Sequence, residues 1–136
     1  MKLRTKRNLV AAMQCGVLDA AKYHRFAACA RMDGEWELAK EFQDAADSDH
    51  TQHFSKEAEL EGVIGHSPDN LRNAISAEMK ELNMFLEFAR EAMEDGDSNA
   101  AALFDGASLD KAESCHRFQA ILEQMDLHGD STNVVA

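Results

Sequence analysis

Proline and long apolar runs are almost missing from this sequence. Pro68 is the single proline among 136 residues, and β-branched residues are few beside many Ala, Glu, Leu, Lys and Met. Such a composition favours helix almost throughout the chain. No apolar stretch approaches the ~18 residues that a membrane-spanning helix needs. We therefore expect an all-α protein that does not cross a membrane.

Paired cysteines and net positive charge are also lacking. The three cysteines, Cys15, Cys29 and Cys115, are odd in number and form no C-x-x-C pair, which argues against a disulfide scaffold or a zinc ribbon and for a cytoplasmic protein. The formal net charge of −11 repels nucleic acid phosphates and anionic membranes, so neither is an expected partner. The basic start, residues 1–8, has no apolar run after it, and we interpret it as a first helical turn and not as a signal peptide.

Four amphipathic segments divide the chain at short turns. They cover about residues 4–31, 35–61, 67–95 and 98–127. Ser67 is the expected cap of the third segment, with Pro68 in its first turn. Long helices of similar length joined by short turns favour an antiparallel bundle. We predict one domain over residues 1–127, an antiparallel four-helix bundle, and a flexible tail over residues 128–136.

The chain is also an internal repeat at an offset of 62 residues. The matching positions are Asn8-Leu9 with Asn70-Leu71, Tyr23 with Phe85, Phe26-Ala27 with Phe88-Ala89, Asp33-Gly34 with Asp95-Gly96, and Phe42 with Phe104. Two copies of one helical hairpin, related by a pseudo-twofold axis, therefore build the predicted bundle. The aromatic residues of both copies fall at helical spacing, and we expect them in the core.

The repeated residues and the linker Gly62-Val63-Ile64-Gly65 form a sequence pattern that resembles the rubrerythrin family of the ferritin-like fold over residues 5–125. The resemblance implies a diiron centre in mid-bundle. Its ligands would be one Glu on the first helix, Glu-x-x-His on the second, two Glu on the third and Glu-x-x-His on the fourth. It also implies a homodimer, since rubrerythrin-like bundles pair. The family's rubredoxin-like module, with its four iron-binding cysteines, has no counterpart after Leu127.

Most of these ligand positions hold other residues in this chain. Carried over without gaps from Tyr23 and Phe85, the seven positions fall on Gly16, Asp49, Gln52, Glu78, Glu81, Lys111 and Ser114. Glu78 and Glu81 keep their ligand, and Asp49 keeps a carboxylate on a shorter stem. The resemblance therefore implies a former metal site, in which Glu78 and Glu81 are the remaining candidates to hold a metal.

Lys111 is the most informative of these substitutions. It falls on the apolar stripe of the fourth segment, between Ala107 and Ser114. A charged ammonium offers no lone pair to a metal and repels a bound cation. Carboxylates packed together without a cation would have to take up protons, and Lys111 can supply the missing charge. We predict a buried polar layer with Lys111 as counter-ion and with Gln52 and Ser114 as hydrogen-bonding neighbours. In the alternative, Lys111 reaches the surface along its aliphatic stem.

A second possible ligand set lies beside the first. With Glu78 and Glu81, it would again provide seven ligands of the right types, and its members are Asp19, His50, His53, Glu113 and His116. The residues of the second helix are displaced by one position and those of the fourth by two. Only a π-bulge or a slip in register would turn them inward. Otherwise these histidines lie on a solvated helix face or in a dimer contact.

Three functions follow from these alternatives. The first is a non-enzymatic, structural or interaction protein that binds no cofactor and forms a homodimer. The second is an iron oxidoreductase of rubrerythrin type, which reduces peroxide or oxidises ferrous iron through the second ligand set. The third is a small-molecule binder that uses the space left by Gly16. Fold does not choose among them, and we favour the first because the predicted layer holds a competing lysine.

Overall fold

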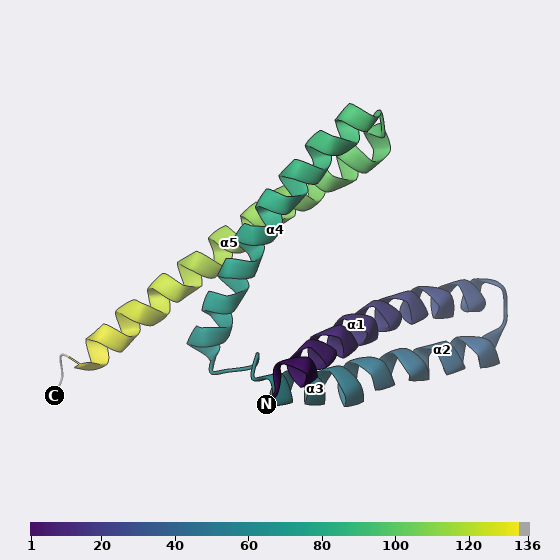
Figure 1. Cartoon of the computed structure of the whole chain (residues 1–136), viewed down its shortest axis with the longest axis horizontal. Helices are drawn as coiled ribbons and strands as arrows, with labels where there is room; N and C mark the ends of the chain where they lie inside the picture. Colours follow the sequence, from purple (N-terminus) through teal and green to yellow (C-terminus); the bar gives the residue numbers. More distant parts are fainter. Residues whose placement is uncertain (134–136) are drawn as a thin grey trace. The chain divides into compact units, whose positions relative to one another are not determined.

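The computed structural model describes residues 1–133, with the backbone alone described for residues 130–133. The described residues form helices joined by short turns, and no β-strand occurs among them (Figure 1). The all-α fold class predicted from the sequence is confirmed. The chain divides into two compact units, Met1–Ile64 and a second that begins at Gly65. The assignment of residues 1–127 to one domain stays a prediction.

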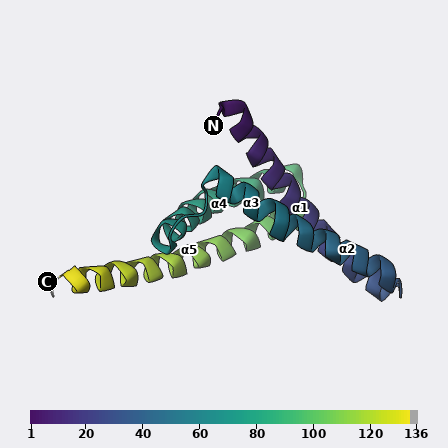
Figure 2. The same ribbon diagram turned by 90° about the horizontal axis from the view of Figure 1, so that it is seen from below.

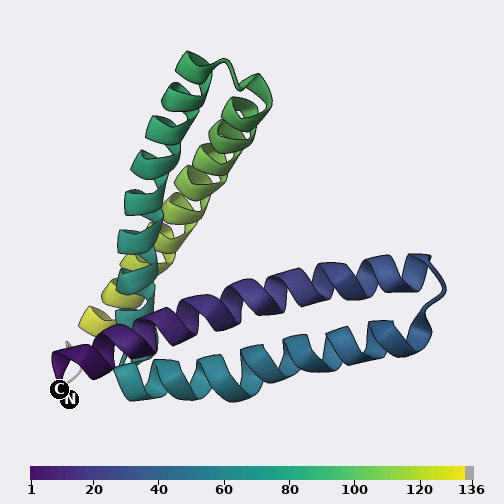
Figure 3. The ribbon, with the colours of Figure 1, turned by 45° about the vertical axis from the view of Figure 1, so that its right-hand side comes forward.

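The N-terminal unit is an antiparallel helical hairpin. Its first helix, α1, spans Leu3–Met32, and the returning half consists of α2 (Trp36–Ser48), η1 (Asp49–Phe54) and α3 (Ser55–Glu61). The two halves lie side by side in Figures 1 and 3. The turn within this hairpin and the turn that follows it both fall where the glycines predict them. Gly62 ends α3, and its backbone has the left-handed conformation that favours glycine (φ 79°).

The expectation of one regular helix over residues 35–61 is wrong in its middle, because η1 is a π-helix. The buried alanines on either side of it show why. Ala46 and Ala58 both face α1 with no exposed surface, yet they are twelve residues apart. Three regular α-turns take about 11 residues. A π-helix closes each turn one residue later, so η1 absorbs the extra residue and returns Ala58 to the face that packs on α1.

The C-terminal unit is a second antiparallel hairpin, formed by α4 (Ser67–Asp95) and α5 (Ser98–Asn133). α5 continues past Leu127, where we expected the helix to end, and Figure 2 shows its last turns running clear of α4. Residues 134–136 of the predicted flexible tail lie outside the described residues. No helix among residues 1–133 has both the length and the apolar character needed to cross a bilayer.

The start of α4 is held in a different way from the one we expected. Ser67 is the first helical residue and not the cap, and no side chain caps the helix from the N-cap position, His66. Instead, the Asn70 side chain accepts a hydrogen bond from the Gly65 amide at 2.7 Å and donates one to the Gly65 carbonyl at 2.9 Å. Pro68 lies in the first turn, as predicted.

Small residues form the contact surfaces within both hairpins. The buried positions are Ala20, Ala27, Ala30, Ala39, Ala46, Ala58, Ala89, Ala92, Ala101, Ser108 and Cys115. No large side chain among the described residues is fully buried. Helices that meet through alanine approach each other closely, and larger side chains then lie along the edges of the contact. Phe26 and Phe88 are 44% and 38% exposed, so their place in the core of a four-helix bundle stays a prediction.

Three rings form a matching cluster in each hairpin. In the first, Tyr23 stacks on Phe42 with ring centroids 6.0 Å apart, and Phe26 meets Phe42 edge-on at 5.4 Å. In the second, the residues 62 positions later do the same: Phe85 stacks on Phe104 at 6.2 Å, and Phe88 meets Phe104 edge-on at 5.6 Å. Such pairs stabilise by about 0.5–1.5 kcal/mol beyond the area they bury.

Two glycines of the C-terminal hairpin should respond to alanine in opposite directions. Gly96 ends α4 with φ 82°, a conformation that costs a residue with a Cβ about 1–2 kcal/mol. Gly106 lies inside α5, and an added Cβ there meets no atom within 4 Å. We expect Gly96→Ala to lower, and Gly106→Ala to raise, the free energy of unfolding in urea, the latter by about 0.5–1 kcal/mol. Changes of the same sign would contradict the assigned backbone.

Candidate functional site: a lysine–carboxylate cluster

The C-terminal hairpin brings together Glu78 and Glu81 of α4 and Lys111 of α5. The Lys111 ammonium donates a hydrogen bond to Glu78 Oε1 at 3.1 Å, and its Nζ lies 2.5 Å from Glu81 Oε2. Glu78 and Glu81 are three residues apart on one helix and so share a face, which lets one ammonium reach both carboxylates. The side chains are 29% exposed at Lys111, 16% at Glu78 and 40% at Glu81. The cluster is therefore partly sheltered and crosses between the two helices.

These contacts favour the charged form of the lysine. The hydrogen bond with Glu81, and then the one with Glu78, raise the pKa of Lys111 above its ordinary value of 10.5, and partial burial opposes them. Lys111 thus carries a full positive charge at neutral pH and neutralises part of the negative charge of the two glutamates. Its ammonium points toward the two carboxylates, as we expect of a counter-ion. The alternative, in which Lys111 extends into solvent, does not describe this geometry.

The other predicted members of the polar layer lie elsewhere in their hairpins. Ser114 is half-buried one turn after Lys111, and its hydroxyl accepts a hydrogen bond from Arg117 at 3.2 Å. In the N-terminal hairpin, a Cβ added to Gly16 would lie 3.9 Å from the backbone oxygen of Asp49. Asp49 is half-buried, while Gln52 is exposed. That all seven positions form one layer stays a prediction.

The π-helix changes which residue shares a face with Asp49. In a regular helix Gln52, three positions later, lies near that face. In the wider turn of η1 the residue four positions later takes that place, so His53 moves toward Asp49 and Gln52 turns away. A π-bulge is the condition for turning the second ligand set inward, and η1 is a π-helix. His50 and His53 are nevertheless both exposed, and the His50 ring stacks on Phe54.

The remaining members of the second ligand set are engaged with other partners or face solvent. Asp19 pairs with Lys22 at 3.2 Å, and Glu113 pairs with Arg117 at 3.9 Å. His116 is exposed on α5, which is a regular helix at this point. No π-bulge therefore turns Glu113 and His116 toward Glu78 and Glu81. The condition that the second set requires is met on one helix and not on the other.

A diiron centre does not fit the residues of the C-terminal hairpin. Both retained glutamates bond to an ammonium that would repel an incoming cation. Within the described part of the chain, no three His, Cys, Asp or Glu side chains are arranged to hold a metal ion. The structure thus leaves the two carboxylates as ion-pair partners, and we derive no chemistry through a metal at this site.

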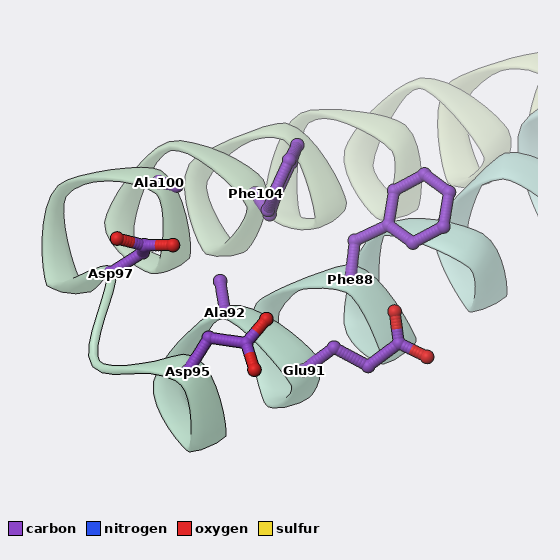
Figure 4. A pocket seen from close by; sticks show the side chains of 7 residues that line it. All are labelled: Phe88, Glu91, Ala92, Asp95, Asp97, Ala100 and Phe104. Carbon is purple, nitrogen blue, oxygen red and sulfur yellow. The ribbon is translucent and has the colours of Figure 1, made fainter.

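A pocket of about 360 Å³ opens at the tip of the same hairpin (Figure 4). Ala92 of α4 points toward the turn of α5 that carries Phe104, and Phe88 closes one end of the pocket. Glu91, Asp95 and Asp97 add carboxylates around the rim. This pocket is open and acidic, and it lies several turns along α4 from the Lys111 cluster.

Comparison with known proteins gives one informative match. The rubrerythrin of Porphyromonas gingivalis (strain ATCC BAA-308 / W83) is 28% identical over 136 aligned residues, which cover 90% of this chain and 68% of that protein. No protein-family model matches the chain. This similarity supports a ferritin-like, rubrerythrin-related family for the chain.

Proposed function

We propose that this protein is a rubrerythrin-related helical protein that has given up diiron chemistry and acts through protein association, as a homodimer. The observation that carries the proposal is the bonding of Lys111 to both Glu78 and Glu81. These are the two positions at which the chain keeps a glutamate expected of a rubrerythrin. The carboxylates that would bridge metal ions in a rubrerythrin serve here to hold α4 against α5.

The electrostatics of the cluster support this proposal. A divalent cation at Glu78 and Glu81 would lie within a few ångströms of the Lys111 ammonium, and the repulsion is strong where water is partly excluded. Loss of the lysine proton would remove the repulsion. The pKa of Lys111 is raised and not lowered, so this loss becomes harder in the folded protein. The ion pairs therefore compete directly with metal binding.

A second candidate function is the iron oxidoreductase that uses the second ligand set. The π-helix favours it, since η1 moves His53 toward the face of Asp49. It requires the same change of register on α5, which is a regular helix around Glu113 and His116. We therefore rank it below the first function.

Metal analysis of the purified chain separates the two functions. We expect well under one iron per chain after growth in iron-supplemented medium, and again after anaerobic addition of ferrous iron and desalting, because Lys111 occupies the carboxylates. Elemental analysis and the near-ultraviolet absorption of an oxo-bridged iron pair give the readout. Lys111→Gln removes the competing charge and should bind more ferrous iron than the natural protein.

Two matched variants of the π-helix complete this experiment. Two irons per chain would contradict the first function and favour the second, in which His53→Ala should abolish binding and Gln52→Ala should not. Under the first function, neither variant changes the low metal content. Melting temperatures that are equal with and without ferrous iron would agree with a fold that no longer depends on metal.

A further inference from the structure

An apolar groove runs along one flank of the N-terminal hairpin. It has a volume of about 480 Å³, and its lining includes Val10, Met13 and Val17 of α1, Phe54 of η1, and Glu61 and Val63 at the end of α3. Val10 and Val17 are 42% and 48% exposed. The groove lies within one hairpin, and we call it the α1–α3 groove.

The groove contains a carboxylate without a counter-charge. Glu61 Oε2 is buried and has no hydrogen-bond partner among the described residues, and the same is true of Glu57 Oε2 one turn earlier on α3. A buried carboxylate oxygen without a partner is costly, and a cation or donor brought to it recovers that cost. An occupant that combines an apolar stripe with a basic side chain therefore suits this groove.

The first half of α1 has that combination. Leu3, Val10 and Val17 follow each other at seven-residue intervals on one face, and Leu3 is 63% exposed. The basic side chains of this stretch, Lys2, Arg4, Lys6 and Arg7, are exposed. No ion pair joins them to an acidic side chain within the described residues of the hairpin. The stripe is symmetric about Val10, so it can pair with an antiparallel copy of itself.

We propose that the α1–α3 groove is a dimer interface, in which α1 of a second copy lies antiparallel along α1 with the twofold axis beside Val10. The arrangement places Val10 on Val10 of the second copy and Leu3 on its Val17, because positions 3 and 17 are equally far from position 10. This inference rests on the proposed homodimer and adds its surface and symmetry. Contacts of this isologous kind are the commonest in homo-oligomers.

The same symmetry brings a cation to Glu61. Lys6 of the second copy falls at the level of Gln14, which lines the groove together with Glu61. Arg7 and Lys6 are about 100° apart around α1, and Lys6 lies on the side of α1 that faces α3. A twofold axis between antiparallel helices keeps each residue on its own side, so Lys6, and not Arg7, lies toward α3 of the facing hairpin. Lys6 can then bond to the unpartnered oxygen of Glu61, and the reciprocal pair forms on the other side of the axis.

The groove also lies away from the face that the predicted polar layer uses. Gly16 precedes Val17 by one residue and so points about 100° away from it around α1. Tyr23, on the same side as Gly16, stacks on Phe42. The His24 ring hydrogen-bonds Gln43 at 3.2 Å on the groove side, seven residues beyond Val17. A homodimer through the groove thus leaves the face with Gly16 and Tyr23 free for its own packing.

Sedimentation equilibrium of the full chain over a range of concentrations tests this interface. We expect a dimer, and on the order of 100-fold weaker dimerisation for Val10→Glu, which juxtaposes two like charges at the axis. Leu103→Glu alters an equally apolar, 71% exposed residue of α5 and should leave the dimer unchanged. Circular dichroism checks that both variants stay helical. A monomeric natural protein, or a dimer that Val10→Glu leaves intact, would overturn the proposal.

Charge reversal and cross-linking test the register. Lys6→Glu and Glu61→Lys should each weaken the dimer, their combination should restore it, and Arg7→Glu should have a smaller effect than Lys6→Glu. With Cys15 and Cys29 replaced by serine, Val10→Cys should form an intermolecular disulfide rapidly under mild oxidation, whereas Leu18→Cys should not. Equal cross-linking of both would contradict the assigned axis. The metal analysis above is independent of these results, so either proposal can fail alone.

Discussion

Replacement of Lys111 by methionine is expected to lower the free energy of unfolding by about 2 kcal/mol at neutral pH. This value lies between the ~0.2–1 kcal/mol of exposed ion pairs and the ~3–5 kcal/mol lost when one partner of a buried pair is removed. The intermediate value follows from the partial exposure of the cluster, in which Glu78 is 16% and Glu81 40% exposed. Methionine keeps the apolar stem but leaves two glutamates without a counter-charge. Urea unfolding followed by circular dichroism gives the measurement.

Two controls separate charge pairing from packing. Lys80 is exposed on the same hairpin, and Lys80→Met should change the stability by less than about 0.5 kcal/mol. In the background of Lys111→Met, replacement of both Glu78 and Glu81 by glutamine should recover most of the loss, because no unpaired carboxylate then remains. If Lys111→Met alone leaves the stability unchanged, the ion pairs do not hold α4 against α5 and the proposed function loses its support.

The stability difference between the natural protein and Lys111→Met should depend on pH with a definite sign. The pKa of Lys111 is raised in the folded protein above 10.5, so the stabilisation is fully present below pH 10.5. It is lost as pH rises through the raised pKa, because the folded protein then gives up the proton that favoured it. The stability difference between the natural protein and Lys111→Met should therefore be constant from pH 7 to 10 and shrink above that range.

Ala27→Leu is expected to destabilise the N-terminal hairpin by about 2–3 kcal/mol. Ala27 has no exposed surface and faces the returning half of the hairpin. A leucine there adds three carbon atoms where the helices meet through alanine, and overpacking of this kind costs about 1–3 kcal/mol. The two halves must separate or turn to accept it, which would also disturb the rings of Tyr23 and Phe42. Thermal unfolding, with near-ultraviolet circular dichroism for the tyrosine environment, measures both effects.

Ala21→Leu is the matched control for this change. Ala21 is exposed on the same helix, and leucine is nearly as good a helix former as alanine, so the stability should change by less than about 0.5 kcal/mol. A loss at Ala21 as large as that at Ala27 would point to an effect on helix formation and not on packing between the helices.

The sequence by itself determined the all-α class, the helical segments and the turns. The single proline, the periodic apolar stripes and the glycines at positions 34, 62 and 96 act through local backbone preferences, and these operate without knowledge of tertiary contacts. The meeting of Lys111 with Glu78 and Glu81 was also predictable. Positions 78 and 81 share one face of a helix, and position 111 lies on the inward stripe of its antiparallel neighbour.

Only the tertiary structure decided which residues of the second helical segment face α1. It also decided that the buried residues are the small ones and that the carboxylates of the groove lack partners. The repeat matches Ala46 with Ser108, both buried, but also Ala58 with Ala120, which is exposed. This difference between the two repeats can be seen only in the packing on α1, which shows which side each residue faces. The residue types themselves give no clear local signal of a π-helix. Likewise, Glu57 and Glu61 read as ordinary surface charges until α3 lies against α1 and buries one oxygen of each. Local preference sets where helices begin and end, whereas contact between helices sets which face of each is buried.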